Sequence, residues 1–258
     1  MTARKSDLPV RAASGVVMIV IAVAAIGYGG IAFTALTGVA AVVIALEWAG
    51  LMRASRGATW LLVAGTALPL LVLILGGPGV PREVVLGVAL ITTIGVALAG
   101  RGPWLGAGVA YAVLPVLSLI YLRDQYDGIT LTLWTLVVVW ATDIGAYFAG
   151  RAIGGPKLAP RLSPNKTWAG LLGGMAAALA VGLALAWPFN LSWRLAGMAA
   201  LLAAAAQGGD LFESWLKRRA GVKDSGHILP GHGGVMDRVD GVVPVAVIVA
   251  GLVMVGYP

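Results

Sequence analysis

Residues 130–150 read TLTLWTLVVVWATDIGAYFAG, a run of 21 residues with one charged side chain, Asp143. An α-helix of about 20 apolar residues crosses a hydrocarbon core roughly 30 Å thick, so this run predicts a transmembrane helix. An aspartate inside such a helix costs about 2.5–3.5 kcal/mol on insertion scales and persists mainly where it pairs with a cation or lines a wet cavity. The run therefore predicts a membrane fold and a polar site within it.

Runs of the same kind recur along the whole chain. The 258 residues are 59% hydrophobic and 11% charged, with a mean hydropathy of +0.92, whereas soluble domains carry roughly 25% charged residues. This composition excludes a water-soluble globule and predicts an all-α fold, a polytopic transmembrane helical bundle of about nine spans. Gly27-Tyr28-Gly29-Gly30 is the turn signal between the first two spans, and about eight or ten spans remain open. The predicted spans cover residues 14–28, 31–51, 59–76, 84–100, 104–122, 130–150, 168–188, 193–211 and 242–257.

Basic residues set the expected orientation of these spans. Lys and Arg concentrate in the cytoplasmic loops of membrane proteins. With the spans above, 15 of the 18 basic residues fall at the N-terminus or in one set of alternate loops, and the other set holds only Arg82, Arg123 and Arg194. We expect a multi-pass cell-membrane protein whose N-terminus and two long polar stretches, 151–167 and 213–241, face the cytoplasm. Topology then explains the net charge of +7 without nucleic acid as a partner.

The polar stretches also divide the chain by expected role. Residues 1–130 are interpreted as transmembrane scaffold helices and residues 131–258 as the catalytic region. Glu47 is the intramembrane acid of the scaffold, and we interpret it as a carboxylate near the cytoplasmic interface, where its cost is small. Abundant Gly and Ala favour close helix packing, as from Gly170 to Gly174, and such faces also suggest a homodimer.

Chemistry is expected first in the segment from Gln207 to Arg219. Carboxylate oxygens are hard ligands that suit Mg²⁺, which keeps several waters and bridges one or two carboxylates to substrate phosphates. An amphipathic helix end with internal ion pairs explains the same pattern equally well. Helical spacing aligns four polar side chains of this segment on one stripe: Asp210, Glu213, Ser214 and Lys217.

The following stretch, residues 223–241, combines glycines with further charges. Gly233 and Gly234 permit positive φ and close approach of backbone N–H groups to anions. Asp237 and Asp240 are three residues apart and are predicted to share a helical face. Arg238 is expected to point elsewhere, to bind phosphate or to snorkel to the membrane surface.

The chain has two histidines and no cysteine. The absence of cysteine excludes disulfides, thiolate catalysis and cysteine-ligated metals. With only His227 and His232 as imidazole ligands, a structural zinc site is disfavoured. We expect both histidines to order the loop or to hydrogen-bond phosphate.

The other polar stretch contains an expected anion site. Ser163 is predicted to be an N-cap with Pro164 at the first helical position, so that the positive end of the seventh span faces the cytoplasmic surface. Lys157 and Lys166 are near it in sequence, and a helix N-terminus with neighbouring lysines attracts anions. Positive-inside charge with ordinary capping remains the alternative for this segment.

Several segments together resemble phosphatidate cytidylyltransferases, also called CDP-diacylglycerol synthases. The signature lies in residues 214–240 and consists of Ser214-Trp-Leu-Lys217-Arg218, Lys223-Asp224, Pro230-Gly-His232-Gly233-Gly234 and Asp237-Arg238-Val-Asp240. Upstream segments that are similar to the family are Asp143-Ile-Gly-Ala-Tyr147-Phe-Ala-Gly150-Arg151, Lys157-Leu-Ala-Pro and Ser163-Pro-Asn-Lys166-Thr167-Trp168. Ala169 departs from the family, which commonly has Glu there, so no role is assigned to it. Residues 1–130 resemble the family in hydropathy alone.

The resemblance implies that CTP and phosphatidate react to give CDP-diacylglycerol and diphosphate, with Mg²⁺ as cofactor in one or two positions. CTP is cytosolic and phosphatidate lies in the lipid bilayer, so the site is expected at the cytoplasmic ends of the later spans. The expected principal metal ligands are Asp210 and Asp237, followed by Glu213, Asp240 and Asp143. The residues expected to act in catalysis are Asp210, Asp237, Lys217 and Lys223, and those expected to bind substrate are Lys157, Ser163, Lys166, Ser214, Arg218, His232, Gly233, Gly234 and Arg238.

Two rival functions fit the sequence less well. A CDP-alcohol phosphotransferase needs a D-G-x-x-A-R motif, and Asp240-Gly241 is followed by Val-Val-Pro instead. An ion-coupled transporter would also place Asp143 and Asp210 in the membrane. Transport, however, does not require two long cationic loops or a glycine-rich acidic loop.

Overall fold

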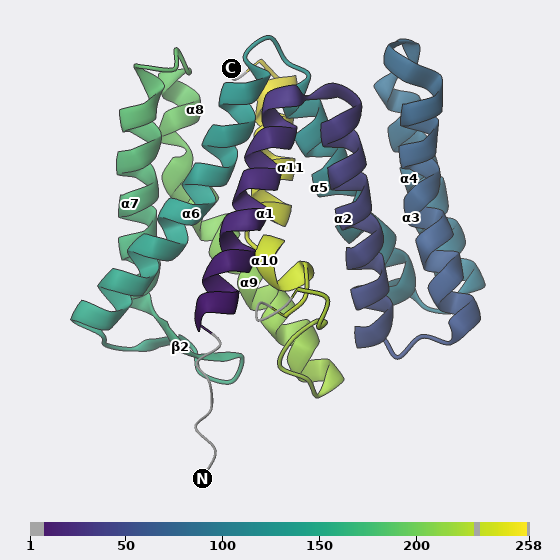
Figure 1. The fold of residues 1–258 in the computed structure, drawn as a ribbon. Coiled ribbons are helices and arrows are strands. Elements are labelled where there is room, and N and C mark those ends of the chain that lie inside the picture. The colour runs from purple at the N-terminus through teal and green to yellow at the C-terminus, as the bar shows by residue number, and fades with distance from the viewer. Residues whose placement is uncertain (1–7, 230–232, 257–258) are drawn as a thin grey trace. The chain divides into compact units, whose positions relative to one another are not determined.

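The computed structural model describes residues 8–229 and 233–256, which cluster into two compact units (Figure 1). Unit 1 comprises the chain up to Ala112 together with Asp224–Arg238, and unit 2 comprises Val113–Lys223 together with the chain from Val239 onward. The loop that begins at Asp224 therefore packs with the N-terminal helices. The division of roles between residues 1–130 and 131–258 stays a prediction.

Unit 1 is built from consecutive helices. Gly29, with a φ of 64°, separates its first two helices and confirms the predicted turn. Ser55 caps the third helix, because its side chain accepts a hydrogen bond from the Ala58 N–H at 3.3 Å. The elements are α1 (Leu8–Tyr28), α2 (Gly30–Leu51), α3 (Arg56–Gly76), the short 3-10 helix η1 (Gly77–Gly79), α4 (Arg82–Ala99), the first half of α5 (Pro103–Arg123) and α10 (Met236–Val239), whose last residue belongs to unit 2.

Unit 2 contains the remaining helices and one hairpin. Its most extensive helix contact joins α6 and α7, which run side by side in Figure 1, and α9 packs against both. The elements are the second half of α5, α6 (Gly128–Ile153), β1 (Lys157–Ala159), β2 (Ser163–Thr167), α7 (Trp168–Ala186), α8 (Trp193–Gly197), α9 (Ala199–Ala220) and α11 (Val242–Met254).

The helices confirm the predicted fold class, an all-α polytopic membrane protein. Within residues 8–229 and 233–256, six helices are long and apolar enough to cross a membrane, namely α2 to α7. α11 and the Gly15–Tyr28 part of α1 are apolar but shorter. Each predicted span coincides with a helix, or with α8 and the first half of α9 for residues 193–211. The number of spans and the cytoplasmic N-terminus stay predictions.

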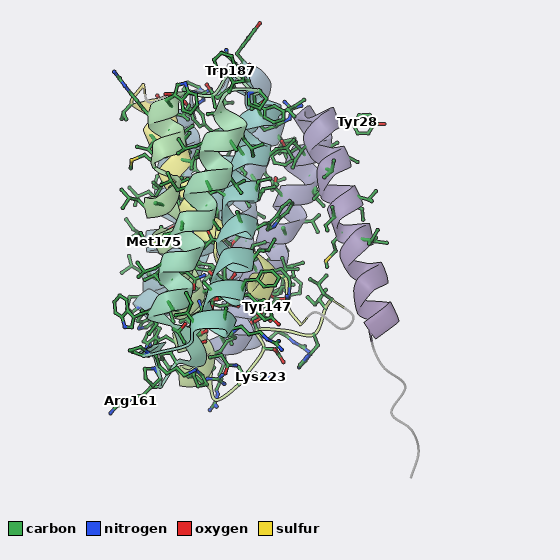
Figure 2. All side chains as sticks on the ribbon, turned by 90° about the vertical axis from the view of Figure 1, so that its left-hand side faces the viewer. Tyr28, Tyr147, Arg161, Met175, Trp187 and Lys223 are labelled. Carbon is green, nitrogen blue, oxygen red and sulfur yellow. The ribbon has the colours of Figure 1, made fainter. Side chains whose placement is uncertain are left out.

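The dimensions of unit 2 suit a bilayer. α7 has 19 residues, begins with Trp168 and is followed by Trp187, and both tryptophans are exposed. At 1.5 Å per residue such a helix is about 28 Å long, close to the thickness of the hydrocarbon core. Figure 2 shows Arg161 and Lys223 at one end of unit 2, Trp187 at the other and Met175 between them. Basic side chains thus mark one end of the unit, and an aromatic side chain typical of membrane interfaces marks the other.

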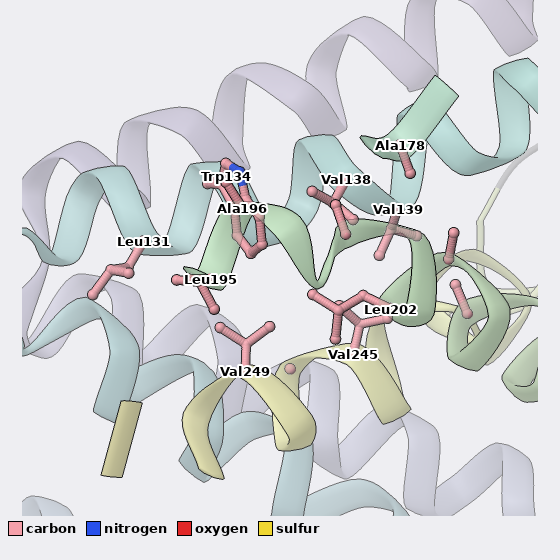
Figure 3. Close-up of a cluster of buried hydrophobic side chains, with 14 of the residues drawn as sticks. Leu131, Trp134, Val138, Val139, Ala178, Leu195, Ala196, Leu202, Val245 and Val249 are labelled. Carbon is pink, nitrogen blue, oxygen red and sulfur yellow. The ribbon is translucent and has the colours of Figure 1, made fainter. Parts of the chain in front are cut away.

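The core of unit 2 joins the helices that carry its polar residues. Trp134 on α6, Leu202 on α9 and Val245 on α11 are buried and belong to one apolar cluster (Figure 3). The Trp134 indole N–H also donates a hydrogen bond to the Gly182 carbonyl of α7 at 3.3 Å. These contacts fix α6, α7 and α9 relative to one another.

The close packing predicted from small residues is present between α6 and α7. A buried face of α7 repeats every fourth residue and consists of Gly170, Gly174, Ala178, Gly182 and Ala186. A Cβ added at Gly174 would lie 2.8 Å from the Thr142 carbonyl oxygen of α6. The face is used within the chain, so it offers no support for the homodimer.

Replacing Gly174 by Ala is expected to lower the melting temperature, because the added methyl group overpacks the contact with α6 at a cost of about 1–3 kcal/mol. Gly197→Ala is the matched control, since a Cβ there meets no atom within 4 Å, and helix propensity then favours Ala by about 0.5–1 kcal/mol. Thermal unfolding in detergent, followed by tryptophan fluorescence, compares the two variants. A Gly174→Ala protein as stable as the Gly197→Ala protein would contradict the packing account.

The predicted N-cap at Ser163 is wrong. Ser163 lies in β2 and pairs with Ala159 of β1, while Lys157 pairs with Thr167. Thr167 is the residue that caps α7, because its side chain accepts a hydrogen bond from the Gly170 N–H at 3.0 Å. Strand pairing keeps Pro164 extended, and α7 begins at Trp168, the first residue of the predicted span 168–188.

The predicted helical face shared by Asp237 and Asp240 is also wrong. α10 ends at Val239, so Asp240 follows the helix. α9, in contrast, continues to Ala220 and ends at Gly221, whose left-handed φ of 76° closes the helix. The first part of the second polar stretch is therefore helical, and its irregular part begins at Gly221.

Candidate functional site

A cavity of about 550 Å³ lies within unit 2. Its walls come from α6, β2, the start of α7 and the middle of α9. Three of the predicted site residues, Asp143, Lys166 and Asp210, line it together with Ala146, Tyr147, Gly150, Arg151, Asn165, Thr167, Gly170, Leu171 and Gln207.

An ion pair joins two of these predicted residues across the cavity wall. Lys166 Nζ lies 2.5 Å from Asp210 Oδ2, and the two side chains are 16% and 32% exposed. Ser214, one turn further along α9, donates a hydrogen bond from its hydroxyl to Asp210 Oδ1 at 3.3 Å. Both Asp210 oxygens thus have polar neighbours, and the hairpin that carries Lys166 is tied to α9.

The third predicted residue in the cavity is held by a polar side chain of α9. Gln207 donates a hydrogen bond from Nε2 to Asp143 Oδ1 at 3.4 Å. Gln207 is buried, whereas Asp143 is exposed to the cavity. Asp143 therefore satisfies the expectation that an acid inside a spanning helix lines a polar cavity.

Two further predicted acids of unit 2 are Glu213 on α9 and Asp240, just before α11. Glu213 is fully buried and forms an ion pair with Lys217 at 3.4 Å, one turn away on α9. Burial raises the pKa of Asp240, and the negative charge of Asp210 adds to the rise. The chain at Asp240 can approach α9 closely because Gly209, next to Asp210, has no side chain.

Three predicted acids of unit 2 interact electrostatically with one another and with Lys166. Asp143, Asp210 and Asp240 repel one another, and the Lys166 ammonium offsets part of this repulsion. Among the described residues no three acidic, His or Cys side chains surround one position as a closed metal site does. Mg²⁺ commonly binds through one or two carboxylates, waters and substrate phosphates. The donors therefore fit a Mg²⁺ ion that arrives with a phosphate ligand.

Three predicted residues of the second loop, Gly233, Gly234 and Asp237, lie together within unit 1. Asp237 Oδ2 accepts hydrogen bonds from the Ser225 N–H, the Ser225 hydroxyl and the Gly234 N–H at 2.9, 2.9 and 2.8 Å. Gly233 has a φ of 80°, as predicted for a tight glycine turn. Asp237 thus organises its own loop, and the predicted role of this carboxylate as a metal ligand stays a prediction.

The burial of Glu47 and its hydrogen bonds to the second loop were not predicted from the sequence. Glu47 is 5% exposed, buried in unit 1, and its carboxylate contacts the same loop. Oε1 accepts a hydrogen bond from the Val235 N–H, and Oε2 accepts one from the Met236 N–H, both at 2.8 Å. A charge between apolar residues of a predicted span was its only sequence signal.

The other predicted residues have simpler surroundings. Arg218 donates a hydrogen bond to the Val222 carbonyl at 3.3 Å and so braces the end of α9. Lys157, Lys223 and Arg238 are exposed, and Ser163 is half-buried in β2. Gly234 is buried in the loop beside Asp237, and His232 lies outside the described residues.

Several polar residues of the cavity received no predicted role. Gln207 follows the apolar run Ala203–Ala206, so a polar residue in an otherwise apolar helix was the available signal. Arg151 donates a hydrogen bond to the Tyr147 hydroxyl at 2.8 Å, one helical turn away on α6. Asn165 precedes Lys166 on β2. Arg151, Tyr147 and Asn165 all lie in segments that the resemblance had already marked.

Comparison with known proteins extends this resemblance to the whole chain. Residues 9–255 match the model of the Cytidylyltransferase family. A phosphatidate cytidylyltransferase of Brucella suis biovar 1 is 43% identical over 251 residues, which cover 93% of this chain and 91% of the relative. The phosphatidate cytidylyltransferase of Haemophilus influenzae is 44% identical over 128 residues, 46% of this chain and 44% of the relative. That of Staphylococcus aureus is 45% identical over 125 residues, 47% of this chain and 48% of the relative.

The first of these alignments corrects the expectation that residues 1–130 share only hydropathy with the family, because it covers 93% of the chain. Since the match runs through the apolar helices as well as the polar segments, the chain belongs to the cytidylyltransferase family and is a membrane-embedded nucleotidyltransferase.

Proposed function

We propose that this protein is a phosphatidate cytidylyltransferase, which joins CTP and phosphatidate to give CDP-diacylglycerol and diphosphate in a Mg²⁺-dependent reaction of phospholipid biosynthesis. The observation that carries the proposal is the Lys166–Asp210 ion pair on the wall of the unit 2 cavity, with Asp143 beside it. The names of the related proteins support the choice of substrates.

Both substrates are anionic, so the site must first reduce their repulsion. Lys166 supplies a positive charge at the cavity wall, and Arg151 and Asn165 line the same cavity. When a triphosphate enters, the Lys166 ammonium exchanges its contact with Asp210 for a contact with phosphate. That exchange releases the Asp210 carboxylate for a cation.

Asp210 and Asp143 are the proposed Mg²⁺ ligands in unit 2, with Asp240 and Glu213 behind them. A Mg²⁺ ion held by these carboxylates would neutralise part of the phosphate charge. Gln207 keeps Asp143 oriented, and the Ser214 hydroxyl does the same for Asp210. These contacts orient the two carboxylates that would hold the cation.

The chemical step is a displacement at the α-phosphorus of CTP. An oxygen of the phosphatidate phosphate forms the new P–O bond, and the bond between the α-phosphorus and the bridging oxygen to the β-phosphate breaks, so that diphosphate leaves. The attacking phosphate is already ionised near neutral pH, and no side chain has to remove a proton from it. The chain's contribution is therefore to position both substrates and stabilise the charge on the leaving group.

The location follows from the two substrates. CTP is water-soluble, and phosphatidate keeps its acyl chains in the bilayer. We propose that the basic end of unit 2, which carries Arg161 and Lys223, faces the cytoplasm at the inner leaflet of the cell membrane. The cavity is then open to both substrates.

The test is an assay of the full chain in lipid nanodiscs with α-phosphate-labelled CTP, phosphatidate and Mg²⁺. We expect a lipid-soluble labelled product that requires all three components, together with an equal amount of diphosphate. Diacylglycerol in place of phosphatidate is the control acceptor and is expected to give none. Absence of a labelled lipid from the complete mixture would overturn the proposed function.

A further inference from the structure

The carboxylate of Glu47 links α2 to a loop far away in the sequence. Its two oxygens accept hydrogen bonds from the backbone N–H groups of Val235 and Met236, and the Ser225 hydroxyl lies 3.2 Å from Oε2. These contacts span 178 to 189 residues of sequence. All the residues involved belong to unit 1.

The surroundings of Glu47 are shaped for this contact. A Cβ added at Gly226 would lie 2.8 Å from Glu47 Oε1, and one at Gly234 would lie 2.6 Å from the same atom. Only glycine at both positions lets the loop backbone come this close. Trp48, the next residue on α2, is buried and donates its indole N–H to the Trp104 carbonyl at 2.8 Å, which holds this turn of α2 in place.

The same contacts lead directly to Asp237. Val235 and Met236 are the two residues before it, and Ser225 bonds Asp237 through both its N–H and its hydroxyl. The Ser225 hydroxyl lies between the two carboxylates, 2.9 Å from Asp237 and 3.2 Å from Glu47. Glu47 therefore sets the backbone that carries Asp237 and Arg238.

We propose that Glu47 is a positioning residue: its buried carboxylate holds the loop backbone at Val235 and Met236, and with it the Asp237 side chain, in the conformation that turnover requires. Burying a carboxylate costs folding free energy unless its oxygens accept hydrogen bonds. If the Glu47 side chain only filled space, an apolar residue could take its place without loss of stability. The link to catalysis rests on the proposed function, whereas the effect on the loop does not.

The experiment compares Glu47→Gln with Glu83→Gln in the full chain in nanodiscs. Glu47→Gln keeps the size of the side chain but turns an NH₂ group toward one of the backbone donors. Glu83 is an exposed acid of the same unit, in the first turn of α4, and controls for loss of one charge. Hydrogen exchange of peptides covering residues 224–238 is measured without substrate, and kcat and KM for CTP are measured separately.

For Glu47→Gln we expect the loop amides to exchange faster, on the order of tenfold or more, and the turnover number to fall by a similar factor. The change in KM should be smaller. Glu47→Asp keeps the charge but has a shorter reach, and it should recover part of both effects. Glu83→Gln should match the wild type. If Glu47→Gln does not fold, Ser225→Ala, which removes one bridging hydroxyl, is judged by the same criteria.

Unchanged exchange in the loop would overturn the proposal without touching the proposed function. Faster exchange throughout unit 1 would assign Glu47 to general stability and would also overturn it. Faster exchange confined to the loop, together with an unchanged turnover number, would show that the loop conformation is not needed for the reaction and would overturn the positioning role.

Discussion

Asp210→Asn is expected to reduce turnover on the order of 10³-fold. Losses of about this size follow when one preorganised group that stabilises the transition state is removed. The substitution keeps the shape of the side chain but removes the negative charge that pairs with Lys166 and is proposed to bind Mg²⁺. The protein should still insert and fold, because Asn can accept the hydrogen bond from Ser214. Initial rates over a range of Mg²⁺ concentrations measure the effect.

Asp127→Asn is the matched control for this variant. Asp127 is an exposed acid of the same unit that precedes α6 and makes no side-chain cap hydrogen bond. Its replacement should leave the rates unchanged. Wild-type turnover by Asp210→Asn at every Mg²⁺ concentration would remove Asp210 from the metal site.

Lys166→Ala is expected to lower kcat/KM on the order of 100-fold, because a charge-assisted contact to phosphate is lost and the Asp210 carboxylate loses its counter-charge. Initial rates measured with CTP varied, and then with phosphatidate varied, show which substrate's phosphate Lys166 contacts. Arg161→Ala removes a positive charge from the same hairpin, at an exposed position outside the cavity lining, and should change the rates little. Unchanged kinetics for both substrates would exclude Lys166 from the site.

The sequence was sufficient for features that depend on local pattern. Apolar runs located the helices, and the glycine cluster at residues 27–30 located the first turn. Helical spacing placed Asp210 one turn from Ser214 and Glu213 one turn from Lys217, and both pairs are in contact. The alternative of an ion-paired helix end is thus also realised, because Glu213 and Lys217 form an ion pair within α9.

Features that depend on tertiary contacts were not accessible in this way. Ser163 and Thr167 are both good N-cap residues, and only the pairing of β1 with β2 decides between them. The partners of Glu47 lie more than 170 residues away, beyond the range of any local pattern. Gln207 reaches Asp143 from another helix, so its role follows from the packing of α9 against α6.

The central claim is that the cavity beside Asp210 receives CTP from the cytoplasm. The natural chain lacks cysteine, so one cysteine introduced at Asn165, a cavity-lining position, reports on that site alone. A membrane-impermeant maleimide should label Asn165→Cys from the cytoplasmic face of oriented vesicles, and Mg²⁺ with CTP should slow the labelling. Tyr126→Cys, exposed in the connection between α5 and α6, is the control and should label from the opposite face without protection. Labelling of Asn165→Cys from the opposite face, or at a rate that saturating CTP does not change, would contradict the account.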